Sequence, residues 1–100
     1  MFARVSIFNA APEGLEKSLR IAQESVLPPL RGVEGSTGVI MLGDRQTGRS
    51  IGITLWQSEE AMRASEETAT RLRTESAEAA DEEIVAVERY EVMIEERWGS

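Results

Sequence analysis

Few side chains in this sequence could do chemistry, because its 100 residues include no histidine and no cysteine. Their absence excludes a Ser-His-Asp triad, a cysteine nucleophile, a zinc ribbon, an iron–sulfur cluster and a histidine metal ligand. It also removes the one side chain whose ordinary pKa lies near 7. No glycine-rich phosphate loop follows a strand. A general base would have to be a carboxylate with a raised pKa, unless the substrate is itself acidic.

Three residues are the candidates for a site: Asn9, Trp56 and Tyr90. Asn9 ends a strand-like segment, where asparagine commonly caps or turns the backbone, although its amide could also hold a substrate carbonyl. Trp56 ends a second strand-like segment, so its ring either packs in a core or interface or forms the wall of a ligand pocket. The hydroxyl of Tyr90 could donate to a bound enolate, or it could be satisfied by a backbone partner.

Several charged residues have two interpretations. Arg45 and Arg49 flank a turn, where they are either exposed to solvent or anchor an anionic ligand or a partner subunit. Arg4, Glu88 and Arg89 lie within strand-like segments, where a charge is unexpected unless it is paired. An Arg4–Glu88 pair is predicted if their two strands are neighbours and the register agrees.

The charge balance is acidic, with a formal net charge of −7 and an isoelectric point near 4.6. Nine acids and three arginines between Ser58 and Glu83 carry nearly all of it. Such a run is typical of a solvated helix face; a carboxylate metal site is the alternative, but the spacing matches no calcium-binding loop. The charge argues against nucleic-acid and anionic-membrane partners, and no apolar run approaches the ~20 residues of a membrane span. We expect a cytoplasmic protein without metal or cofactor.

The elements that must position these residues follow from periodicity. Residues 2–9 alternate as a strand, and a helix follows in which apolar residues recur at helical spacing. Pro28 and Pro29 are expected to end that helix, with a loop over residues 30–35. Residues 37–42 and 50–56 predict a hairpin, whose turn contains Gly48, a residue free to adopt a positive φ. Ser58 is expected to cap a second helix that ends near residue 80, and residues 84–94 predict the last strand.

The β-α-β-β-α-β order predicts an α+β, ferredoxin-like domain over residues 1–100, with a four-stranded antiparallel sheet and both helices on one face. The strands are apolar on both sides, so the uncovered face should pack against a second copy of the chain. We expect Phe8 or Trp56 in that homodimer interface and the acidic helix in water. If the first strand is turned so that its alternate residues face the other way, Val5 and Ile7 lie in the interface instead.

The element order, the turn GDRQTG at 43–48 and the segment ITLWQSEEAM at 53–62 resemble the dimeric α+β barrel superfamily, and within it the antibiotic-biosynthesis-monooxygenase-like domain. The resemblance extends from Phe2 to about Ile94. Members that oxidise aromatic polyketides without a cofactor typically place an asparagine near the end of strand one and a tryptophan in the pocket, and Asn9 and Trp56 match these positions. Haem-degrading members use a helical histidine, which this chain lacks.

Two functions are therefore predicted. The first is a small dimeric barrel protein that binds a hydrophobic or aromatic molecule. The alternative is a cofactor-independent monooxygenase acting on an aromatic polyketide-like or quinol substrate, with Asn9, Trp56 and Tyr90 lining a pocket between sheet and helices. A cavity of ~300 Å³ or more with polar groups converging on it would favour a ligand, whereas a filled core would favour a purely structural domain.

Overall fold

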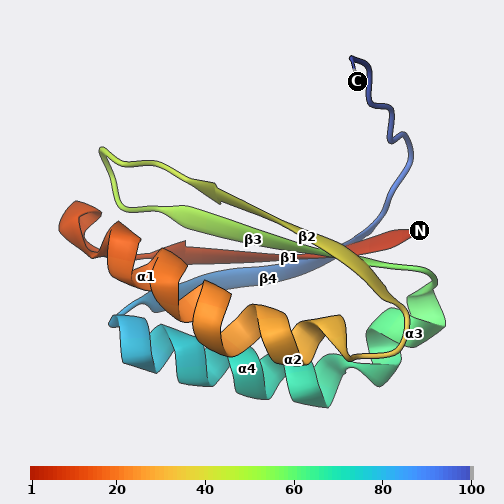
Figure 1. The fold of residues 1–100 in the computed structure, drawn as a ribbon, viewed down its shortest axis with the longest axis horizontal. Coiled ribbons are helices and arrows are strands. Elements are labelled where there is room, and N and C mark those ends of the chain that lie inside the picture. Colours follow the sequence, from red (N-terminus) through yellow and green to blue (C-terminus); the bar gives the residue numbers. More distant parts are fainter. Residues whose placement is uncertain (100) are drawn as a thin grey trace.

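The computed structural model describes residues 1–99, and it confirms the ferredoxin-like arrangement (Figure 1). One antiparallel sheet has the strand order β2-β3-β1-β4. Its strands are β1 (Phe2–Asn9), β2 (Ser36–Gly43), β3 (Ser50–Trp56) and β4 (Glu83–Glu91). The helices cover one face of this sheet and leave the other face open. The predicted limits of β1 and β3 are confirmed, whereas β4 begins one residue earlier and ends three residues earlier than expected.

Two helical connections form the covering layer. The first joins η1 (Pro12–Gly14), α1 (Leu15–Ile21), the π-helical segment η2 (Ala22–Val26) and α2 (Leu27–Arg31). The second consists of α3 (Glu59–Ala64) and α4 (Glu66–Ala80). No helix within residues 1–99 is both long enough and apolar enough to cross a membrane.

The first helical connection does not end at Pro28 and Pro29, as the sequence predicted, but continues to Arg31. Both prolines lie in the first turn of α2, where a helical N–H has no carbonyl partner within the helix and its loss costs little. The π-helical segment η2 immediately precedes α2. It changes the spacing of the backbone hydrogen bonds at the point where a continuous α-helix would need the N–H groups that the two prolines lack.

The second connection is interrupted at Ser65, where a single helix was expected. Ser58 caps α3 as predicted, its hydroxyl accepting a hydrogen bond from the Ala61 N–H at 3.1 Å. Ser65 is buried and its hydroxyl donates to the Met62 carbonyl at 2.7 Å, which competes with the regular helical bonding. Asp81, with φ at 57°, then ends α4 in the left-handed conformation.

The two faces of the sheet differ in an unexpected way. Toward the helices, the middle of β1 and β3 presents Ser6, Gly52 and Thr54, so this side is small and polar. The opposite side, which we name the outer face, is almost entirely apolar. It consists of Ala3, Val5, Ile7, Gly38, Ile40, Leu42, Ile51, Ile53, Leu55, Ala86, Glu88 and Tyr90.

The expectation that Phe8 or Trp56 lies between subunits is therefore wrong. Trp56 is 0% exposed and Phe8 is 9% exposed within one chain, both on the helix side. Trp56 forms the core with Leu30 and Met62 at the end of the sheet under α2 and α3, where a large ring is needed to fill the space. The alternating phase of β1 consequently places Val5 and Ile7 on the outer face.

Candidate functional site

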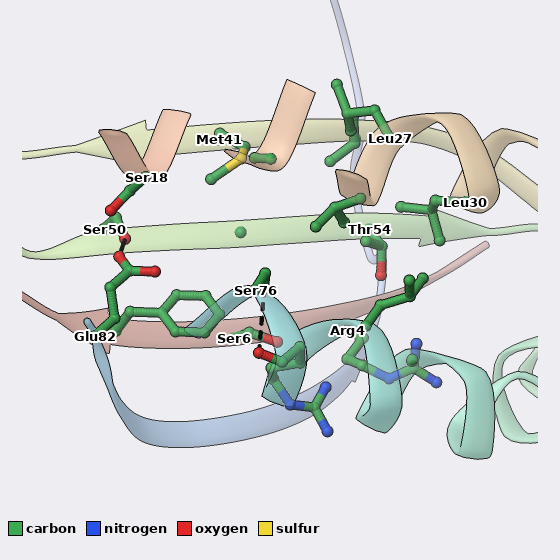
Figure 2. A pocket seen from close by; sticks show the side chains of 18 residues that line it. Arg4, Ser6, Ser18, Leu27, Leu30, Met41, Ser50, Thr54, Ser76 and Glu82 are labelled. Carbon is green, nitrogen blue, oxygen red and sulfur yellow. Dashed lines mark hydrogen bonds between the residues drawn. The ribbon is translucent and has the colours of Figure 1, made fainter. Parts of the chain in front are cut away.

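A cavity of about 100 Å³ lies between the sheet and the helices (Figure 2). It exists because the centre of the helix-facing sheet lacks large side chains: Ser6 pairs with Gly52, and a methyl group added at Gly52 would meet no atom within 4 Å. The apolar walls are Phe8, Ala22, Val26, Leu27, Leu30, Val39, Met41, Ala69 and Leu72, and the polar ones are Arg4, Ser6, Ser18, Ser50, Thr54, Arg73, Ser76 and Glu82.

The π-helical segment η2 contributes Ala22 and Val26 to this cavity. A second hollow of about 310 Å³ is lined by residues of α2 and β2 and shares Leu27, Leu30 and Val39 with the first. The two spaces are therefore neighbours on the α2–β2 side of the cavity. Short π-helical turns occur frequently at functional sites, which fits this placement.

One end of the cavity is built around Arg4, which is 2% exposed. Its Nη2 donates to the Met62 carbonyl at 2.7 Å, to Ser65 Oγ at 3.0 Å and to Glu66 Oε2 at 2.8 Å. Its guanidinium carbon lies 5.3 Å from the centre of the Trp56 ring, within cation–π range. The predicted Arg4–Glu88 pair is absent, because the register sets Arg4 opposite Arg89 and Glu88 opposite Val5 on the outer face.

Glu66 forms ion pairs with two arginines. Besides Arg4, it accepts from Arg89 Nε at 2.8 Å and from Arg89 Nη2 at 2.6 Å. These bonds, first those from Arg89 and then that from Arg4, hold the pKa of the Glu66 carboxyl at about 2, against the effect of its partial burial. Glu66 is thus ionised at neutral pH, and its low pKa makes it a poor general base.

Arg73 lines the same cavity from α4 and is half-buried. Its Nη2 donates to Thr70 Oγ1 at 3.2 Å, and no carboxylate in the described residues forms an ion pair with it. Burial, followed by the positive charges of Arg4 and Arg89, lowers the pKa of the Arg73 guanidinium below its ordinary value. The arginine end of the cavity therefore carries more positive than negative charge.

Glu82 occupies the opposite end of the cavity, next to Ser18 and Ser50 (Figure 2). Ser50 Oγ donates to Glu82 Oε2 at 3.3 Å. Burial raises the pKa of the Glu82 carboxyl, and hydrogen bonding by Ser18 and Ser50 offsets part of the rise. Glu82 is the kind of carboxylate that the sequence argument required for a base, but nothing in the sequence separates it from its eight acidic neighbours.

The structure does not bring the three sequence candidates together. Asn9 is exposed at the end of β1, and Tyr90 is 54% exposed on the outer face, where a hydrogen bond with Glu88 raises the pKa of its hydroxyl. Trp56 is a core residue whose Nε1 donates to Thr54 Oγ1 at 2.9 Å. None of the three lines the cavity, although Trp56 borders it through Arg4 and Thr54. In the hairpin turn, exposed Arg45 forms an ion pair with Glu16 of α1.

Comparison with solved structures agrees with this geometry. A dimeric ferredoxin-like protein from an uncultured marine organism superposes with a TM-score of 0.70 at 14% identity, covering 98% of this chain and 100% of the other. A monooxygenase of Streptomyces coelicolor, solved with the ligand nanaomycin D, superposes with a TM-score of 0.65 at 20% identity over 96% and 92% of the two chains. The chain therefore shares the fold of this dimeric ferredoxin-like protein and of this monooxygenase.

A further structure with this fold is a cofactor-independent oxygenase of Streptomyces nogalater, which has a TM-score of 0.64 at 15% identity over 94% of both chains. No family model matches the sequence. Among curated proteins, an uncharacterised protein of Mycobacterium tuberculosis is 37% identical over 78 residues. That match covers 78% of this chain but only 35% of the relative, so the chain spans about a third of its length.

Proposed function

We propose that the chain forms a homodimer and binds a small, largely apolar molecule between its sheet and helices. The observation that carries the binding proposal is the hollow centred on Ser6 and Gly52 beneath η2, where a purely structural domain would have a filled core. Its volume of about 100 Å³ is below that of most ligand pockets, but the adjoining hollow of about 310 Å³ extends the space available.

The outer face supports the homodimer. Eleven of its twelve residues carry no charge, and its strands expose Ile40, Leu42 and Tyr90. An apolar area that covers a whole sheet face is typical of an interaction surface. The neighbour from the marine organism is described as dimeric, and a two-fold dimer is the commonest way to cover a self-complementary face.

Filling the cavity tests the binding proposal. Saturation-transfer NMR with 1-naphthol, hydroquinone and anthrone should detect at least one bound molecule for the native chain and none for Gly52→Leu, whose side chain would occupy the space. Gly52→Ala, with a single added methyl group, is the matched variant and should retain most of the binding. Equal signals from the native chain and Gly52→Leu would show that the molecules bind elsewhere.

A second candidate function is oxidation without a cofactor, and Glu82 is the observation that favours it. A carboxylate with a raised pKa could remove a proton from an activated CH₂ group, giving a carbanion that O₂ oxidises to a carbonyl while one water leaves. The positive arginine end of the cavity would stabilise the negative charge that develops on the substrate.

Oxygen uptake with anthrones, which carry an activated CH₂ group, tests this second function. The native chain should consume oxygen, and Glu82→Gln should reduce the rate by about 10²-fold or more, as expected for loss of a general base. Glu78→Gln, an exposed change on α4, is the control and should leave the rate unchanged. Equal rates for the native chain and Glu82→Gln would remove Glu82 from the reaction.

A further inference from the structure

The arginine end of the cavity holds more positive charge than the protein neutralises. Arg4, Arg73 and Arg89 gather near a single carboxylate, that of Glu66, which leaves a local surplus of two positive charges. The chain as a whole has a net charge of −7, so this surplus is against the overall balance. Like charges held close together in a partly buried place are unfavourable unless another group compensates them.

The guanidinium group of Arg4 is also only partly satisfied by hydrogen bonds. Among residues 1–99, its Nη2 carries every hydrogen bond that the side chain makes, whereas Nε and Nη1 are buried without a partner. Buried donors in native proteins are nearly always satisfied, so a guanidinium with two orphaned nitrogens needs an explanation. Stacking on Trp56 holds the group in place and offsets only part of its charge.

Arg73 is the member of the group that a ligand could reach. It is half-buried, it lines the cavity, and it has no acidic partner within residues 1–99. Two hydroxyls line the cavity from the sheet and can also donate: that of Ser6 in β1 and that of Thr54 in β3, whose oxygen accepts from Trp56. Phe8, Met41 and Leu72 line other parts of the cavity and would pack against an apolar body.

We infer that the bound molecule is an organic monoacid, with its carboxylate at Arg73 and its apolar part against Phe8 and Leu72. This inference rests on the proposed binding function and specifies its ligand class. Glu82 lies at the far end of the cavity from Arg4, as Figure 2 shows, and would repel a second carboxylate placed there. The site therefore selects a molecule with one acidic group over a dicarboxylate.

Benzoate, its neutral analogue benzamide and the dicarboxylate terephthalate test this inference by NMR titration of the native chain. We expect benzoate to bind at least about tenfold more tightly than either of the others, which corresponds to one charge-assisted contact. Arg73→Gln should remove the advantage of benzoate over benzamide. Arg71→Gln, an exposed arginine two residues earlier on α4, should preserve it.

The outcomes separate the inference from the function on which it rests. If benzoate and benzamide bind equally well and Gly52→Leu abolishes both, the cavity binds ligands but the monoacid preference is wrong. If Arg73→Gln still binds benzoate more tightly than benzamide, the carboxylate does not lie at Arg73. If terephthalate binds as well as benzoate, Glu82 does not repel a second carboxylate. If no probe binds, or if Gly52→Leu changes nothing, the binding function itself fails.

Discussion

At the scale of single residues, Arg4 connects elements that are far apart in the sequence. From β1 it reaches the Met62 carbonyl, Ser65 and Glu66 at the junction of α3 and α4, and it covers Trp56. The sequence indicated that a charge within β1 must be paired, which is confirmed. It could not identify Glu66 as the partner, because the pair spans 62 residues and depends on which side of β1 faces the helices.

Removing the Glu66 carboxylate should therefore destabilise the fold. We expect Glu66→Gln to lower the free energy of unfolding by about 3 kcal/mol at pH 7, since it leaves Arg4 buried without its counter-charge. Urea unfolding followed by circular dichroism measures this change. Glu67→Gln, on the neighbouring exposed position, should change the free energy by less than about 0.5 kcal/mol.

The same pair predicts a pH dependence. Folding lowers the Glu66 pKa from 4.5 to about 2, so its stabilising effect is complete above pH 4.5 and is lost as the pH falls toward 2. The native chain should lose stability relative to Glu66→Gln across this window when both are unfolded in urea. A constant difference between the two proteins from pH 5 to pH 2.5 would contradict the assignment.

Glu82 should behave in the opposite sense. Burial raises its pKa in the folded state, so its ionised form opposes folding above that pKa, and the cost disappears once the pH falls below 4.5. Glu82→Gln should therefore be more stable than the native chain at pH 7 and equally stable at pH 4. Thermal unfolding at both pH values checks this, with exposed Glu78→Gln as the control.

At the scale of elements, periodicity predicted β1 and β3 residue by residue because a pleated strand repeats strictly every two positions. Rules based on local sequence failed to predict where the helices end, because tertiary packing determines those positions. Proline statistics predicted the end of a helix that η2 and α2 continue, and helical spacing did not reveal the interruption at Ser65. The cavity follows from small residues on neighbouring strands, Ser6 and Gly52, whose pairing depends on strand order.

The hairpin between β2 and β3 offers a test of element packing. A Cβ atom at Gly48 would lie 2.1 Å from the Ala10 carbonyl oxygen, and φ at this residue is +82°. Gly48→Ala should therefore lower the free energy of unfolding by 2 kcal/mol or more, because both the backbone strain and the clash with the end of β1 oppose it. Gly52→Ala, which meets open space, should cost less than about 1 kcal/mol. Equal effects in urea unfolding would contradict the hairpin placement.

At the scale of the whole molecule, the outer face should control assembly. Ile53 lies near its centre, opposite Val5 on one side and Ile40 on the other. Ile53→Glu should shift a dimer to an 11.1 kDa monomer in sedimentation at micromolar concentration while circular dichroism stays unchanged. Glu67→Ala on α4 should leave the dimer intact. Dissociation by Glu67→Ala and not by Ile53→Glu would place the interface on the helices instead.

The alternation of β1 also bears on how the proposed dimer and the proposed ligand share one strand. Val5 and Ile7 point to the outer face, whereas Arg4, Ser6 and Phe8 point to the cavity. The proposed dimer and the proposed ligand would therefore make separate demands on neighbouring positions of one strand of eight residues.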